Sequence, residues 1–203
     1  MKRKTFIATA LLIGAAGLAG CSSMGMGQGW QTLIDGNAGL ENFNRLGDAN
    51  WRAEGGAIVA DKGGASYLVT KKSYKDFQIR AEFWADHTTN SGIYIRAANP
   101  AKIEATTSYE VNIFDQRPAP EYGTGAIVDV AKVSPMPKAG GKWNVFEITA
   151  KGPQLTVVLN GQQTVNVQHS KFAQGPFALQ FAPGANNIPG GAIKWRKVQI
   201  REL

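Results

Sequence analysis

The chain has 203 residues, a formal net charge of +7 and 24 glycines, and this length is sufficient for one domain with a hydrophobic core. Part of the positive charge is an N-terminal cluster, Lys2, Arg3 and Lys4, and the rest is spread along the chain. The composition therefore lacks the clustered basic footprint of a nucleic-acid-binding protein, and the single cysteine excludes an intrachain disulfide.

The first 20 residues have the order of regions that an export signal needs. The cations at positions 2–4 are followed by an apolar run at 6–13 and then by small residues. This run is shorter than the roughly 20 residues that span a bilayer, which weighs against a transmembrane helix. Residues 18–21, Leu-Ala-Gly-Cys, resemble the lipobox of bacterial lipoproteins. That resemblance implies cleavage before Cys21 and acylation of its sulfur, and the alternative is an ordinary secreted protein with an incidental cysteine.

These features divide the chain into a signal peptide at 1–20, a flexible tether at 21–29 and one domain at 30–203. The tether is rich in serine and glycine, a composition typical of flexible linkers. Ser22 follows the cysteine, which resembles the signal that sends Gram-negative lipoproteins to the outer membrane. We therefore expect the protein in the cell envelope, held to the outer membrane through lipidated Cys21 and facing the periplasm.

Beyond Trp30 the hydrophobic pattern is almost everywhere that of half-buried strands, with apolar and polar residues alternating. Asn160-Gly161 has the residue types of a two-residue hairpin turn, and the alternation slips between Trp195 and Val198, which predicts a β-bulge. No segment shows a helical stripe, so the prediction is an all-β antiparallel sandwich or barrel. The strands expected are residues 77–84, 91–96, 109–115, 143–150, 154–159, 164–167, 176–181 and 192–203.

The alternation also predicts which side chains point away from the core. In the strand 109–115, Val111 and Ile113 are expected inward and Glu110 and Asn112 outward. If neighbouring strands pair in order, Arg96 shares the outward face with Glu110, whereas Trp143 is expected in the core. The other side chains expected on that face are Glu82 and Gln180, with the rings of Trp84, Tyr94 and Phe114.

A series of motifs along the domain resembles the 3-keto-disaccharide hydrolase domain family, also called the DUF1080 family. Each motif is short, but they occur in the family's order from about Trp30 to Leu203. They are Trp30-Gln31-Thr32-Leu33-Ile34-Asp35-Gly36, Trp51 with Gly55-Gly56-Ala57-Ile58, Tyr74-Lys75-Asp76-Phe77, Asn90-Ser91-Gly92-Ile93 with Arg96, Tyr109-Glu110-Val111, Thr124-Gly125-Ala126-Ile127, Trp143-Asn144, Leu179-Gln180 and Val198-Gln199-Ile200-Arg201-Glu202-Leu203.

The resemblance implies a concanavalin A-like jelly-roll β-sandwich with a carbohydrate ligand. It further implies activity on 3-keto glycosides, whose glycosidic bond is split after another enzyme has oxidised the sugar at C3. The sequence departs from the family pattern at two places. Asn112 stands where a glutamine is usual, and residues 181–183, Phe-Ala-Pro, replace the family's histidine-bearing segment.

We predict a site on the outward face of these strands. The C2 proton of a 3-keto sugar is acidic, so cleavage needs a base and a partner for the developing oxyanion. Glu110 is the expected base or acid, Arg96 the oxyanion partner and His87 a further acid or base; an Arg96–Glu110 ion pair or an exposed loop histidine is the alternative. No metal-binding spacing or cofactor motif is found. The substrate-binding candidates are Glu82, Tyr94, Asn112, Asp115 and Gln180, with turn and metal roles also open for Asp115.

The leading functional interpretation is an envelope-anchored carbohydrate-active enzyme, a 3-keto-glycoside hydrolase or an eliminative lyase. A glycan-binding lipoprotein without catalytic activity is the second interpretation, and a structural envelope lipoprotein is the third.

Overall fold

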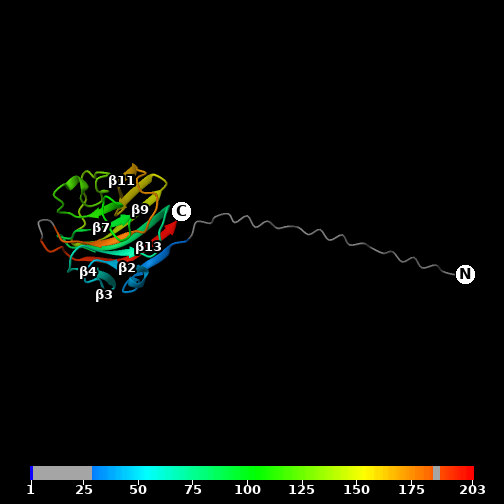
Figure 1. Cartoon of the computed structure of the whole chain (residues 1–203), viewed down its shortest axis with the longest axis horizontal. Helices are drawn as coiled ribbons and strands as arrows, with labels where there is room; N and C mark the ends of the chain where they lie inside the picture. The colour runs from blue at the N-terminus through cyan, green and yellow to red at the C-terminus, as the bar shows by residue number, and fades with distance from the viewer. Residues whose placement is uncertain (2–28, 185–187) are drawn as a thin grey trace.

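The computed structural model describes Met1, residues 29–184 and residues 188–203 (Figure 1). The predicted lipidation site, Cys21, lies outside the described residues. The described chain is all β apart from two short 3-10 helices, and none of its helices is long and apolar enough to cross a membrane. The elements are β1 Gln31–Asp35, η1 Leu40–Asn42, β2 Phe43–Leu46, β3 Arg52–Glu54, β4 Ala57–Ala60, β5 Ser66–Thr70, β6 Phe77–Ala85, β7 Ser91–Ile95, β8 Tyr109–Ile113, η2 Pro120–Tyr122, β9 Lys142–Lys151, β10 Gln154–Leu159, β11 Gln162–Gln168, β12 Ala178–Phe181 and β13 Ile193–Glu202.

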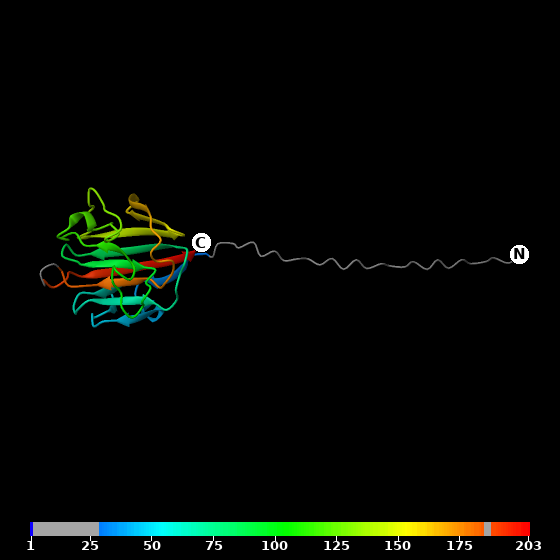
Figure 2. The ribbon, with the colours of Figure 1, turned by 45° about the horizontal axis from the view of Figure 1, so that its top comes forward.

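The strands form two antiparallel sheets that pack face to face as a sandwich. One sheet has eight strands, in the order β11-β10-β9-β6-β13-β4-β3 with β1 also paired to β13. The other has five, in the order β2-β5-β12-β7-β8. Figure 2 shows the strands of both layers running in the same general direction, as in aligned sandwiches. The predicted all-β, jelly-roll-like sandwich is confirmed.

The core lies between the sheets and is built from the residues that the alternation assigns inward. Ile79, Phe83, Ile93 and Val111 are all completely buried. Phe83 stacks on Phe146 with 5.1 Å between ring centroids. Burying one such side chain contributes about 1.5–3 kcal/mol, so the two inner faces hold the layers together.

Two local predictions are also confirmed. Asn160 and Gly161 have φ values of 51° and 82°, the left-handed conformations that the tight β10–β11 hairpin needs. The pairing of β13 with β6 shifts register between Trp195 and Lys197, at the predicted bulge. Both features follow from local residue chemistry, which the sequence displays directly.

The chain changes sheet between β6 and β7, because β6 pairs with β9 and β13 whereas β7 pairs with β8 and β12. Outward-facing residues of β6 and β7 are therefore on opposite surfaces of the molecule. Two long loops, 96–108 and 114–141, follow β7 and β8. Ala97 and Ile103 of the first loop belong to the same buried hydrophobic cluster as Tyr94, and Val128 of the second donates its backbone N–H to the Glu110 carbonyl. The outward face of the five-stranded sheet is thus partly covered by these loops.

Candidate functional site

The outward face of the five-stranded sheet carries polar and aromatic side chains in two rows. Strand register places Tyr94 of β7 opposite Glu110 of β8. In the adjacent row, Tyr67 of β5 is opposite Gln180 of β12, and Gly92 of β7 is opposite Asn112 of β8. We call this surface the Glu110 face; its members are Tyr67, Gly92, Tyr94, Glu110, Asn112 and Gln180.

The side chains of this face are close neighbours that act on one another. The Gln180 amide donates to the Tyr94 hydroxyl across 3.0 Å. The Tyr94 hydroxyl acts to lower the pKa of the Glu110 carboxyl group, and Gln180 acts in the same direction on the pKa of the Tyr67 hydroxyl. The rings of Tyr67 and Tyr94 pack edge to face, with centroids 5.5 Å apart, a favourable aromatic geometry. Tyr67 is half-buried and the other members are buried, so Tyr67 forms the outer rim of the group.

Burial changes the proton affinity of the two central groups. It raises the pKa of the Glu110 carboxyl, and nearby Asp129 acts in the same direction. The Tyr94 hydroxyl and the charge of Arg117 only partly oppose this increase. Burial and then the neighbouring Glu110 charge raise the pKa of Tyr94 far above its ordinary value. Tyr94 is therefore a neutral donor at physiological pH, and Glu110 titrates closer to neutrality than an exposed carboxyl group.

Two amide oxygens on this face are buried without a hydrogen-bond partner among the described residues, Oδ1 of Asn112 and Oε1 of Gln180. The Asn112 amide nitrogen donates to the Tyr122 carbonyl at 2.7 Å, which leaves the oxygen directed elsewhere. Between the two amides lies Gly92, where an added Cβ would be 3.6 Å from Gln180 Oε1 and 3.5 Å from Glu110 Cγ. A buried acceptor without a partner costs about 1–3 kcal/mol, so this pair is suited to accept hydrogen bonds from ligand hydroxyl groups.

Arg96 does not belong to this group, and the prediction that it faces Glu110 is wrong. It follows the end of β7 with a φ of 53°, which turns its side chain out of the strand alternation. The side chain is 1% exposed, and its five N–H groups donate to the carbonyls of Lys75, Gly152 and Phe172 and to Asp76 Oδ1 over 2.6–3.3 Å. No donor remains for an oxyanion, so Arg96 joins chain segments together.

Glu82 is likewise wrongly assigned, because β6 belongs to the opposite sheet. Its carboxylate bonds Arg196 on the outer surface of the eight-stranded sheet, at 2.8 Å. Trp84 lies on that same surface. Trp143, expected in the core, is 38% exposed there and pairs with Trp84 across β9 and β6.

His87 and Asp115 lie beyond the end of the Glu110 face. Asp115 accepts hydrogen bonds from the Thr124 hydroxyl at 2.6 Å and from the backbone of Ala139 and Gly140 at 2.9–3.1 Å. This pattern favours the turn role for Asp115. His87 is exposed and lies against Gly140. Within residues 29–184 and 188–203, no group of three or more His, Cys, Asp or Glu residues is arranged to hold a metal ion.

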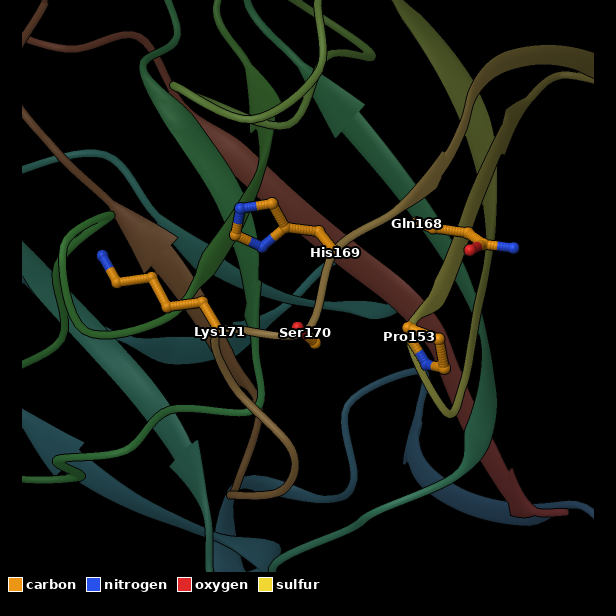
Figure 3. Close-up of a pocket in the computed structure, with 5 residues that line it drawn as sticks. All are labelled: Pro153, Gln168, His169, Ser170 and Lys171. Atoms are coloured by element: carbon orange, nitrogen blue, oxygen red, sulfur yellow. The ribbon is translucent and has the colours of Figure 1, made fainter.

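His169, the second histidine of the chain, lines a different, open cavity of about 540 Å³ at the end of β11 (Figure 3). Its Nδ1 is 3.0 Å from the hydroxyl of Tyr109, a core residue. Figure 3 shows the His169 ring and Lys171 directed away from Gln168 and Pro153. The residues lining this cavity include no carboxylate; they are Pro153, Gln168, His169, Ser170 and Lys171. His169 is therefore occupied in packing the β11 end onto the core.

Comparison with known proteins identifies the domain. A family model described as 3-keto-alpha-glucoside-1,2-lyase-like domain matches residues 29–201. The chain belongs to this family. None of the curated proteins compared with the sequence matches it.

Solved structures show the same fold as this lyase-like domain. A candidate glycosyl hydrolase from Parabacteroides distasonis superimposes with a TM-score of 0.68 at 23% identity, over 87% of this chain and 100% of the other. The carbohydrate-binding module CBM66 from Bacillus subtilis gives 0.59 at 15% identity, over 87% and 98%. A Bacillus subtilis protein with a galectin-like fold gives 0.62 at 9% identity, over 84% and 93%. At these identities the similarity shows the fold alone, and the family suggests a glycosyl hydrolase-like or carbohydrate-binding function.

The alternation of this lyase-like domain predicts Tyr94, Glu110, Asn112 and Gln180 on one face, but it does not indicate three of their neighbours, Tyr67, Arg117 and Asp129. Tyr67 is in the outward phase of Ser66–Thr70, a short strand whose partners are not evident from local pattern. Arg117 and Asp129 come from the loop after β8, and they act on Glu110 through their charges. Their proximity to Glu110 depends on the path of the loop 114–141, which the sequence pattern does not predict.

Proposed function

We propose that the protein splits the glycosidic bond of 3-keto glycosides by elimination, with Glu110 as the acid–base group. The observation that carries this proposal is the position of Glu110 beside two unpartnered amide oxygens, those of Asn112 and Gln180, that flank Gly92. Buried amide acceptors next to a carboxyl group suit a ligand with many hydroxyl groups and one acidic C–H bond. The family match supports the same class of substrate.

Elimination from a 3-keto sugar needs fewer carboxyl groups than ordinary glycoside hydrolysis. Hydrolysis by the usual routes needs two carboxyl groups flanking the bond. The five strands of this sheet contribute one carboxylate to the Glu110 face, that of Glu110 itself, and the neighbouring acid Asp129 comes from the loop after β8. A 3-keto sugar needs only one base, because the carbonyl group at C3 acidifies the proton at C2.

The proposed reaction has two stages. The Glu110 carboxylate removes the C2 proton, and the C–H electron pair forms an enolate with the charge on the C3 oxygen. The enolate then re-forms the carbonyl, a C1–C2 double bond is made, and the C1–O bond breaks. The proton held by Glu110 passes to the departing oxygen, and water can add to C1 afterwards. A raised carboxyl pKa favours this exchange, since acid–base catalysis is most efficient near the operating pH.

In this proposal other groups take the oxyanion role that was expected of Arg96. Arg117 supplies a positive charge near Glu110, and the neutral hydroxyl group of Tyr67, at the rim of the face, supplies a hydrogen bond. Gln180 holds the Tyr94 hydroxyl in position through its amide nitrogen. Donors fixed before the reaction stabilise developing charge without reorganising.

The test is to incubate the purified protein with a 3-keto disaccharide and with its unoxidised parent, and to follow release of the aglycone by chromatography. Cleavage of the keto sugar alone is expected, together with a loss of at least about 100-fold in Glu110→Gln. Glu147→Gln is the matched control, because Glu147 is an exposed acid on the other sheet. Cleavage of the parent at a similar rate, or unchanged turnover in Glu110→Gln, contradicts the proposal.

A second candidate function, glycan binding without cleavage, is favoured by one specific observation. Ala182 follows β12 at the place of the family's histidine-bearing segment, and it bridges Asn90 at the edge of the Glu110 face. His87 is exposed beside Gly140 and His169 packs on Tyr109, so neither is among the members of the face. Binding of both sugars without cleavage in the same assay supports this function.

We also propose that the protein is a lipoprotein of the outer membrane, acylated on Cys21 and facing the periplasm. The basis is the sequence of residues 1–22 alone. Fractionation of cells that express the wild type and Cys21→Ser tests it. Membrane association that is lost in the variant supports the anchor, and a Cys21→Ser protein that stays in the membrane fraction contradicts it.

A further inference from the structure

The outward face of the eight-stranded sheet carries three of the five tryptophans, and a cation lies over each ring. Lys194 Nζ is 4.7 Å from the Trp84 ring centroid, and the Arg196 guanidinium is 4.3 Å from that of Trp143. Arg201 lies 4.8 Å from the Trp30 ring. Trp30 and Trp143 are 37% and 38% exposed, unlike the buried Trp51 and Trp195. Large exposed aromatic groups on a sheet face mark a binding surface more often than isolated apolar residues do.

Part of this surface is a straight row across five strands. Register pairs Trp143 with Trp84, Trp84 with Lys194, Lys194 with Val59, and Val59 with Arg52. With strands about 4.8 Å apart, the row is about 19 Å long. These five residues also line a cavity of about 440 Å³. A cavity of this size on the row accommodates one or two sugar rings and leaves the chain free to continue along the strands.

Two cations line this cavity, and only Arg52 forms ion pairs with acids among the described residues. Asp61 and Glu54 are both bonded to Arg52, at 2.8 and 2.5 Å. Lys194 is half-buried and makes no ion pair with any residue in the part of the chain that the structure describes. An ammonium group held over an indole ring, while both nearby acids are bonded to Arg52 instead, can bind a negatively charged ligand that has a flat apolar face.

We propose that this row is a second, non-catalytic carbohydrate site that binds an acidic saccharide. One face of a sugar ring packs on Trp84 or Trp143, and its carboxylate or sulfate binds Lys194. The site is on the opposite surface from the Glu110 face, so it is independent of the proposed catalytic function. A recessed cavity suits a chain of sugar rings better than a flat lipid surface, against which the aromatic rings would have to project.

Affinity electrophoresis of the purified full chain tests the proposal, with polygalacturonate, dextran sulfate or neutral dextran in the gel. Retardation is expected in polygalacturonate or dextran sulfate, or in both, and the two arms distinguish a carboxylate from a sulfate ligand. Neutral dextran is expected to have no effect. Lys194→Gln and Trp84→Ala are each expected to weaken binding about tenfold, the loss of one charge-assisted contact.

Lys197→Gln is the matched control, since Lys197 is on the same strand, also makes no ion pair among the described residues and does not line the cavity. It is expected to bind like the wild type. Equal losses in the two lysine variants would show a nonspecific charge effect and overturn the proposal. So would equal retardation by neutral dextran, or sedimentation with phosphatidylglycerol vesicles without binding to either acidic polymer. Thermal unfolding of Lys194→Gln, whose side chain is half-buried, confirms that the fold is retained.

Discussion

Replacement of Arg96 by methionine should destabilise the protein severely. The guanidinium is 1% exposed and connects the segment before β6, the β9–β10 turn and Phe172. Methionine fills much of the same volume but leaves carbonyl groups without donors, at about 1–3 kcal/mol each when they stay dry. Asp76 is 31% exposed and recovers its solvation. The cost therefore comes from the carbonyls of Lys75, Gly152 and Phe172, and we expect the free energy of unfolding to fall by about 4 kcal/mol.

Urea unfolding followed by tryptophan fluorescence measures this loss. A change of about 4 kcal/mol corresponds to a fall of roughly 8–16 °C in Tm for a domain of this size. Arg80→Met is the matched control, because Arg80 pairs with Glu147 on an exposed surface, with side chains 49% and 46% exposed. The control should lose less than about 1 kcal/mol. A loss below about 1 kcal/mol in Arg96→Met, accompanied by loss of sugar cleavage, would refute the structural role and restore the catalytic one.

Three further predictions concern the site and its supports. The raised pKa of Glu110 means that the folded state holds this proton more tightly than the unfolded state, whose carboxyl titrates near 4.5. Its stabilising contribution is therefore present below that value and is lost as the pH rises through the folded pKa. Urea unfolding from pH 4 to 8 should show this decline in the wild type but not in Glu110→Gln, and parallel curves would contradict it. In the same assay Asp115→Ala should lower the free energy of unfolding by about 2–3 kcal/mol, because the Thr124, Ala139 and Gly140 donors lose their acceptor. Normal stability with lost sugar binding would instead indicate that Asp115 binds the ligand. Gly92→Ala should reduce turnover at least about tenfold, since the new Cβ would occupy the space beside Gln180 Oε1, at 3.6 Å. Thermal unfolding should also shift to lower temperature, because the same Cβ would be 3.0 Å from the Val111 carbonyl. Unchanged turnover would show that sugar does not approach Gly92.

The parts of the fold that the sequence predicted are those governed by local periodicity. Alternation over Phe77–Ala85 and Tyr109–Ile113 indicates both the strand and its buried side. Tyr94, Glu110 and Gln180 were grouped successfully because each is in the outward phase of a strand and all three strands belong to one sheet. Which sheet a strand joins is not determined by its local sequence, because strand pairing is a long-range contact. The crossing between β6 and β7 separates Glu82 from Glu110 without leaving a mark in the alternation.

Two side chains show where periodicity fails for physical reasons. Arg96 continues the alternation of β7 in sequence, but its left-handed φ of 53° redirects the side chain toward carbonyl groups that only the tertiary fold brings near. Trp143 is apolar and was expected inside, whereas its neighbour Asn144 takes the inward position. Asn144 can be buried because its amide donates to the Ala139 and Lys142 carbonyls and its oxygen accepts from Asn160. A polar residue whose hydrogen bonds are satisfied thus reverses the phase that hydrophobicity predicts.

The most direct test of proton removal at C2 by Glu110 is hydrogen exchange at that carbon. A 3-keto glycoside is incubated with the protein in D₂O, and the C2 proton signal is followed by NMR during cleavage. Loss of that signal with the wild type and with Glu147→Gln, and its persistence with Glu110→Gln, is the predicted result. Cleavage that proceeds with the C2 proton retained in the product, or undiminished exchange in Glu110→Gln, would contradict elimination initiated by Glu110.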